Sequence, residues 1–290
     1  MEGSLPKQLV WVVFYGLSAL GKTYFLNLFK ETSEANAVNI GIVSSDDCSL
    51  EVITKYKARN PGVSTSEAMK KCRKDTIKLF ESKISKLVDQ LKPGKNIIVL
   101  DKVMNGGKFL QDINKTFTVK CPTKLVAIIP WTPSAFQYSY HGMVPFSEPL
   151  ILNVCHRILS RAEHQTVEGS ASKKLWIGLS FVKLYNGLKS LTEKQAEGGI
   201  EQFVDISFHQ ESEETLKSIP PKFTELIKKT LKELRAFQGE ETVCNELASY
   251  LQEPETQEAL KPLLAFGDAA QQKTKILEII KIFETLGKEE

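Results

Sequence analysis

The chain has 290 residues, 42% of them hydrophobic, and a formal net charge of +3. These values fit one large globular domain or two modest ones, and the charge is too small to indicate nucleic-acid binding by itself. The five cysteines contain no C-x-x-C pair, which argues against a disulfide framework and a zinc site and favours a reducing, intracellular compartment, cytoplasmic or nuclear.

A glycine-bounded segment follows the first apolar run. Residues 9–15 (LVWVVFY) have the composition of a buried strand and are too few for a signal peptide or a membrane span, so we expect no membrane association. The next eight residues match G-x-x-x-x-G-K-[ST] without a substitution, in the strand-then-helix context that this P-loop motif requires. They are Gly16, Leu17, Ser18, Ala19, Leu20, Gly21, Lys22 and Thr23.

This motif predicts a nucleoside-triphosphate site. Gly16 and Gly21 allow backbone geometry in which successive N–H groups point at phosphate oxygens. Lys22 adds a cation at the β- and γ-phosphates, and Thr23 offers a hydroxyl to Mg²⁺ at the start of a helix whose N-terminus favours anions. We therefore expect all eight residues to bind ATP or GTP together with Mg²⁺. No base-reading motif distinguishes the two nucleotides.

An acidic pair follows the second predicted strand, which covers residues 35–43. Open α/β sheets place functional groups at the carboxyl ends of their strands, and here the chain continues with two serines, Asp46 and Asp47. One carboxylate would act as a general base on an acceptor hydroxyl, and the other would orient water or metal. Equally, Asp46 or Asp47 would N-cap the next helix, predicted over residues 50–59.

A long amphipathic helix is predicted next. Residues 64–67 have capping-box spacing, and apolar positions recur at helical intervals up to residue 91. Around its start the chain carries seven basic residues, which we call the basic cluster: Lys55, Lys57, Arg59, Lys70, Lys71, Arg73 and Lys74. Such a cluster fits a nucleic-acid backbone, but a solvated helix face is the commoner explanation.

Three further strands complete the predicted sheet. Residues 96–100 (NIIVL) read as a buried parallel strand followed by Asp101, a carboxylate placed to order the Mg²⁺ shell through water. The segment from Lys102 is one residue too long for the K-x-[DN]-G motif of nucleotidyltransferases, which we reject. Residues 124–129 and 202–206 are the fourth and fifth predicted strands. The aromatic-rich loop after residue 130 favours packing over base stacking.

Two arginines lie on one face of the helix predicted over residues 149–162. Arg157 and Arg161 are four residues apart, and in P-loop phosphotransferases an arginine-bearing helix folds over the triphosphate as a lid. Alternatively, the two arginines are surface residues that form ion pairs with Glu148 or Glu163. A helix over residues 173–188 follows.

The helical and strand patterns divide the chain in two. Strands alternating with helices predict an α/β domain over residues 1–218, with a parallel sheet of about five strands flanked by helices. Residues 219–290 show helical patterns and no strand signal. We predict that they form a helical extension, either packed on the sheet domain or presented to a protein partner.

Four segments, in order, resemble the kinase domain of fungal-type tRNA ligases, which is related to the phage-type 5′-hydroxyl polynucleotide kinases. They are the P-loop, the acidic pair at residues 46–47, the strand ending in Asp101-Lys102, and the lid that leads into His164-Gln165-Thr166. The resemblance covers residues 8–187 and says nothing about residues 219–290.

The resemblance implies a P-loop NTPase fold and a role for each matching residue. Lys22 and Thr23 would bind the donor phosphates and Mg²⁺, Asp46 would be the general base on a 5′-OH end of RNA, tRNA-like, and Arg157 or Arg161 would contact the donor phosphates. The reaction implied is RNA 5′-phosphorylation, as in RNA repair or splicing. Lys22, Asp46, Arg157 and Arg161 are thus the expected catalytic residues.

The chain departs from the family where the acceptor binds. Ser49 stands where the phage-type enzymes have an arginine that touches the acceptor phosphate. Our acceptor-binding candidates are therefore Asp47, Lys55 and Lys102. No ligase lysine motif is present, which indicates a kinase module on its own chain. Two alternatives are a P-loop kinase of a small molecule or nucleotide, and a catalytically weak nucleotide-dependent binding or scaffold protein.

Overall fold

The computed structural model describes residues 5–14, 22–103, 112–130, 148–160, 169–185, 200, 202–206, 217, 219–236, 244–264 and 267–286. The strands are β1 (Lys7–Phe14), β2 (Asn39–Ser44), β3 (Gly94–Val103), β4 (Thr123–Pro130) and β5 (Gln202–Ile206). The α-helices are α1 (Lys22–Ala35), α2 (Ser45–Arg59), α3 (Thr65–Asp89), α5 (Ile113–Thr116), α6 (Glu148–Ser160), α7 (Ala171–Tyr185), α10 (Pro221–Ala236), α11 (Asn245–Gln252), α12 (Pro254–Leu260) and α13 (Ala269–Lys281). Two 3₁₀ turns, η3 (Lys261–Leu264) and η4 (Ile282–Glu284), follow α12 and α13.

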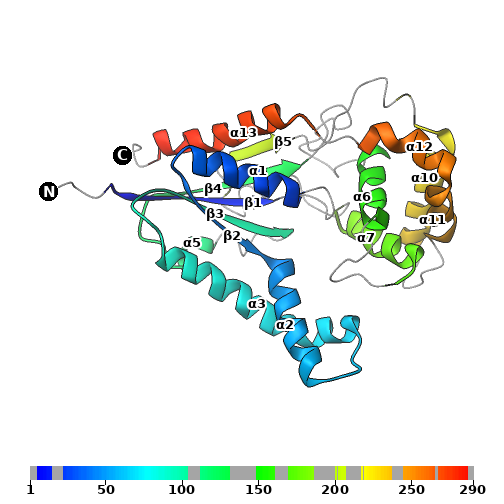
Figure 1. Ribbon diagram of the computed structural model, residues 1–290, viewed down its shortest axis with the longest axis horizontal. Coiled ribbons are helices and arrows are strands. Elements are labelled where there is room, and N and C mark those ends of the chain that lie inside the picture. Colours follow the sequence, from blue (N-terminus) through cyan, green and yellow to red (C-terminus); the bar gives the residue numbers. More distant parts are fainter. Residues whose placement is uncertain are drawn as a thin grey trace.

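The five strands form one parallel sheet in the order β2-β3-β1-β4-β5. Residues 9–13 of the central strand β1 are fully buried, as expected for a parallel strand covered on both faces. Because every strand pair is parallel, all carboxyl ends lie at one edge, which we call the carboxyl edge (Figure 1). The predicted α/β fold with about five parallel strands is confirmed.

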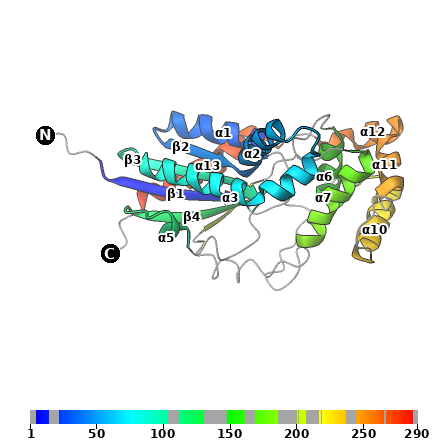
Figure 2. The same ribbon diagram turned by 90° about the horizontal axis from the view of Figure 1, so that it is seen from below.

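Helices cover both faces of the sheet (Figures 1 and 2). On one face, Phe25 and Phe29 of α1 and Ile279 of α13 share a core with alternate residues of β1 and β3. On the other face, Phe80 of α3 and Ile113 of α5 pack on the intervening residues of the same strands. The alternation of β-strand side chains therefore assigns each strand residue to the α1 face or to the α3 face.

The α2 helix leaves the carboxyl edge, and its junction with α3 projects away from the sheet (Figure 1). We call residues 45–78 the α2–α3 arm. A small core of its own, made by Ile53, Ala68 and Cys72, joins the two helices. The Ser64 hydroxyl accepts a hydrogen bond from the Glu67 backbone N–H at 3.2 Å, which confirms the predicted start of the long helix.

Two predicted boundaries near the acidic pair were wrong. The second strand begins at Asn39 instead of residue 35, because α1 continues to Ala35 and ends in a turn where Ala37 has a φ of 56°. The following helix begins at Ser45 instead of residue 50, and its N-cap is Ser44. The suggestion that Asp46 or Asp47 caps this helix is therefore wrong. Serine is as good a cap as aspartate, and Ser44 is the residue with extended backbone at the junction.

The C-terminal helices pack on the rest of the chain. Helices α10 and α11 contact α7, while α13 contacts α1 and β5. The Gln8 side-chain amide on β1 donates to the Leu286 carbonyl at 2.7 Å. Of the two arrangements predicted for the extension, α13 shows the one in which it packs on the sheet domain. The domain boundary between residues 218 and 219 stays a prediction. Of the described helices, none has both the length and the apolar character that crossing a bilayer requires.

Candidate functional site

An ion pair joins two of the predicted site residues at the carboxyl edge. The Lys22 Nζ lies 3.4 Å from the Asp101 Oδ1, and the two side chains are only 14% and 17% exposed. Lys22 opens α1, which follows β1, and Asp101 lies near the end of β3, the strand paired with β1. The topology of the sheet therefore brings together residues that are far apart in the sequence.

The position of Asp101 follows from the alternation of β3. Ile97 and Val99 belong to the core on the α1 face, so Asp101, two residues later, lies on that face beside Lys22. The Lys22 Nζ also lies 6.0 Å from the centroid of the Phe14 ring. An aromatic face, a carboxylate and partial burial together hold the ammonium group at the edge of the sheet.

The acidic pair adds negative potential at the same edge. Burial raises the pKa of the Asp101 carboxyl above its ordinary value; the Lys22 ammonium opposes this rise, and the Asp46 and Asp47 carboxylates add to it. Asp46 and Asp47 act on Asp101 because β2 pairs with β3, with Ser44 in register with Asp101. Three carboxylates and one ammonium group thus share this region.

The start of α2 determines how the acidic pair is presented. The Ser44 hydroxyl accepts a hydrogen bond from the Asp47 N–H at 3.3 Å, and both aspartates are exposed in the first helical turn. Negative side chains are favourable there because of the helix dipole. An exposed carboxylate at this edge can accept a proton from a hydroxyl group.

The residues present fit a magnesium ion bound together with a nucleotide. Within the described parts of the chain, no group of three or more His, Cys, Asp and Glu side chains that would hold a metal occurs. Mg²⁺ usually takes one or two protein oxygens and completes its shell with water and substrate phosphates. The Thr23 hydroxyl, exposed at the start of α1, and the Asp101 carboxylate, through water, supply such oxygens.

Two acceptor-binding candidates lie away from the Lys22–Asp101 pair. The Lys102 Nζ lies 5.5 Å from the centroid of the Phe80 ring on α3, on the face of the sheet opposite to Asp101. The Lys55 Nζ lies 2.7 Å from a Glu51 carboxylate oxygen on α2. The ion pair with Glu51 already occupies Lys55.

Several predicted site residues lie outside the described part of the chain. They are Gly16, Leu17, Ser18, Ala19, Leu20, Gly21, Arg161 and the His164-Gln165-Thr166 sequence. The aromatic-rich loop also lies there. Arg157 is half-buried in the last turn of α6, and its predicted contact with the donor phosphates stays a prediction.

Two residues with clear roles were absent from the predicted site. Ser44 caps the helix that carries the acidic pair, and Lys83 of α3 holds Glu51 of α2 at 2.9 Å. The Ser44 signal was present, since a serine at a strand end before two acids is a common cap pattern. The contact between Lys83 and Glu51 spans 32 positions and has no local pattern.

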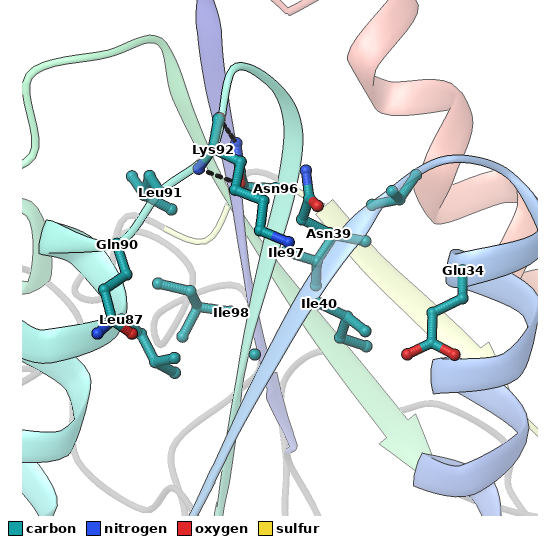
Figure 3. A pocket seen from close by; sticks show the side chains of 12 residues that line it. Glu34, Asn39, Ile40, Leu87, Gln90, Leu91, Lys92, Asn96, Ile97 and Ile98 are labelled. Atoms are coloured by element: carbon teal, nitrogen blue, oxygen red, sulfur yellow. Dashed lines mark hydrogen bonds between the residues drawn. The ribbon is translucent and has the colours of Figure 1, made fainter.

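A cavity of about 340 Å³ lies at the opposite, amino end of β2 and β3. Figure 3 shows it between the ends of α1 and α3, with Glu34 on one side and Gln90 on the other. The Asn96 side chain donates to the Lys92 carbonyl and accepts from the Lys92 N–H, so its polar atoms are engaged in the fold. This cavity is separate from the carboxyl edge and brings together no reactive groups.

Comparisons with known proteins identify no relative in sequence. No protein-family model matches the chain, and no curated protein matches it. Solved structures similar to it include a candidate kinase from Chloroflexus aurantiacus, with TM-score 0.38 and 10% identity over 80% of this chain and 99% of that one.

Two further structures are similar to a comparable degree. The PezAT toxin–antitoxin system of Streptococcus pneumoniae has a TM-score of 0.36 and 14% identity over 96% of this chain and 91% of that one. Shikimate kinase from Bacteroides thetaiotaomicron has a TM-score of 0.35 and 13% identity over 76% and 98%. At these TM-scores and identities, the solved structures do not indicate what this protein does. Its function must be inferred from the sequence motifs and from the geometry of the carboxyl edge.

Proposed function

We propose that this protein is a Mg²⁺-dependent phosphotransferase that moves the γ-phosphoryl group of ATP or GTP to the 5′-hydroxyl of RNA. The observation that carries this proposal is the contact between Lys22 and Asp101 beside the acidic pair at the carboxyl edge. Lys22 belongs to a complete P-loop motif, and ligands bind open α/β sheets at this edge. The RNA acceptor rests on the resemblance of the acidic pair and lid segments.

The chain's own residues have distinct tasks in this reaction. Lys22 places positive charge on the donor phosphates, and the Asp46 carboxylate accepts the proton that the attacking hydroxyl loses. Thr23 and, through water, Asp101 would hold Mg²⁺, which when bound neutralises charge on the donor phosphates. Arg157 and Arg161 of the lid segment would stabilise charge on the transferring group.

The test is direct transfer of label. The protein is incubated with Mg²⁺, ATP or GTP labelled at the γ-phosphate, and a 5′-OH oligoribonucleotide; an oligodeoxyribonucleotide and a mixture of small hydroxyl metabolites are tested in parallel. We expect label on the RNA. Transfer only to a small hydroxyl compound would reassign the acceptor, and nucleotide binding without transfer to any acceptor would favour the scaffold alternative.

The Asp46→Ala variant tests the general base. Positioned groups of this kind contribute on the order of 10²-fold or more to rate, so we expect a loss of at least that size in RNA phosphorylation. Nucleotide affinity, measured by calorimetry, should change little because Asp46 does not bind the donor. Asp89→Ala, which removes an exposed acid from the last turn of α3, outside the α2–α3 arm, is the control and should phosphorylate RNA normally. Normal turnover by Asp46→Ala would refute the assignment.

A further inference from the structure

The structure divides the basic cluster into two groups, and the neighbouring lysines Lys83 and Lys78 are added to the first and the second group, respectively. The lysines of the first group contact oxygen atoms of α2 or α3, either within one helix or between the two helices. Lys55 and Lys83 both contact Glu51, at 2.7 and 2.9 Å. Lys57 donates to the Thr65 hydroxyl at 3.0 Å, and Lys71 pairs with Glu67 at 2.8 Å. These cations are engaged in the fold and are poor candidates for ligand binding.

The second group consists of exposed cations beyond salt-bridge distance of any carboxylate in the described chain, although the charge of Lys70, after the hydrogen bond from Lys71, contributes to lowering the pKa of Glu67. We call them the arm cations: Arg59, Lys70, Arg73, Lys74 and Lys78. Within the described part of the chain, none of the five makes an ion pair. Lys70, Lys74 and Lys78 recur every four residues, so they lie along one face of α3 at intervals of about 6 Å.

The arm is a firm platform for these charges. The core made by Ile53, Ala68 and Cys72 is separate from the two cores of the sheet, and it holds α2 against α3. The pair between Glu51 and Lys83 ties the two helices a second time. Because the two helices are already packed together, ligand binding has to order only the side chains of the exposed cations and not the backbone that carries them.

We infer that the arm cations form a binding surface for the phosphate backbone of the RNA whose 5′ end lies at Asp46. This inference rests on the proposed function. Ser49 stands where the phage-type kinases have an arginine that contacts the acceptor phosphate, and the arm cations would take over that contact. Asp46 stands at the base of α2 and Arg59 at its far end, so the same helix joins the reacting end to the arm cations. A row of unpaired cations along a helix is the feature that backbone binding requires.

The dimensions of the arm set a minimum acceptor length. The 15 residues of α2 extend about 20 Å from the acidic pair to the junction with α3. A stacked strand advances about 3.4 Å per nucleotide, so about six nucleotides reach from Asp46 to Arg59 at the far end of α2. Acceptors shorter than this would not reach the arm cations at that end.

Paired charge reversals test the surface. The variant Lys70→Glu/Lys74→Glu is compared with Lys273→Glu/Lys281→Glu, which makes the same charge change at two exposed lysines of α13, on the α1 face. Binding of a fluorescent 5′-OH oligoribonucleotide of roughly 12 nucleotides is measured by anisotropy over a range of salt concentrations. We expect the arm variant to lose at least about tenfold in affinity and to lower the salt slope by about two, and the control to change less than about twofold.

The outcomes separate this inference from the proposed function. Phosphorylation of a dinucleotide should be equal in both variants, which shows that the catalytic site is intact. RNA binding that depends on the arm cations, in a protein without transfer activity, would support the surface and refute the kinase. Equal affinity of the two variants for the long RNA, or an unmodified protein that binds an acidic protein but no RNA, would refute the surface.

Discussion

Lys22 has two anionic groups within its range: the Asp101 carboxylate and, in the proposed reaction, the donor phosphates. Its ammonium group lies 3.4 Å from Asp101, and phosphate binding would require it to turn toward the donor. We therefore expect Asp101→Asn to bind ATP without Mg²⁺ roughly three- to tenfold more tightly, because the competing partner of Lys22 is lost. Calorimetry in the presence of a chelator measures this affinity.

The control for Asp101→Asn removes a neighbouring negative charge and keeps the ion pair. Asp46→Asn leaves the contact between Lys22 and Asp101 intact, so its gain in Mg²⁺-free affinity should be smaller. Equal gains in the two variants would mean that general repulsion of the triphosphate, instead of competition for Lys22, limits binding. Added Mg²⁺ should then help the unmodified protein more than Asp101→Asn, which lacks the carboxylate that orders the metal shell.

Among the secondary-structure elements, α2 and α3 are linked by a carboxylate whose effect depends on pH. Hydrogen bonds from Lys55 and Lys83 lower the pKa of Glu51 to about 2, from an ordinary value of 4.5. A carboxyl group with a lowered pKa in the folded state stabilises the fold above its unfolded pKa and loses this effect as the pH falls. We expect the stability difference between the unmodified protein and Glu51→Gln to be constant above pH 4.5 and to disappear as the pH approaches 2. Urea unfolding at a series of pH values measures it.

The Lys83→Met variant separates the two partners of Glu51. It removes the contact between the helices and keeps the pair with Lys55 inside α2. The pH-dependent part of the stability should therefore shrink without vanishing. A pH profile for Lys83→Met identical to that of the unmodified protein would show that the link between α2 and α3 contributes nothing to stability.

Local sequence signals predicted the elements better than their boundaries. The five strands and the capped α3 were predictable because apolar runs and the Ser64 cap are local patterns. The end of α1 was not, because the left-handed turn residue after it is Ala37, where glycine or asparagine is the usual signal.

The candidate site shows the same division between local and tertiary information. The proximity of Lys22, Asp46 and Asp101 could be predicted because each lies near or beyond the end of a strand, and parallel strands bring their carboxyl ends together. The pair between Lys55 and Glu51 is a local contact between residues four apart in α2. The contact between Glu51 and Lys83 depends on how α2 packs on α3, so only that packing identifies Lys83 as a link between the two helices.

At the scale of the whole molecule, the C-terminal helices share a core with the β-sheet and the helices on its α1 face. Buried residues of β1, α1, α7 and α10 belong to one cluster with Ile276, Ile279 and Leu286 near the C-terminus. The hydrogen bond from Gln8 to Leu286 joins the first strand to the last turn. This continuity indicates that α13 and the sheet unfold together, so the extension acts as part of the support for α1 and its Lys22.

The variant Ile279→Ala tests whether α13 and the sheet are one cooperative unit. Ile279 is fully buried against the α1 face, so its truncation should cost about 2–5 kcal/mol of unfolding free energy. Leu277, two positions away and 38% exposed, is the matched control, and Leu277→Ala should cost less than about 1 kcal/mol. Unfolding is followed by tryptophan fluorescence, which includes buried Trp11 on β1, and by far-ultraviolet circular dichroism. Coincident shifts of both signals are expected, because residues in one core lose their packing together. A helical signal that melts before the fluorescence changes would instead show that α13 detaches on its own and that Lys22 is held without it.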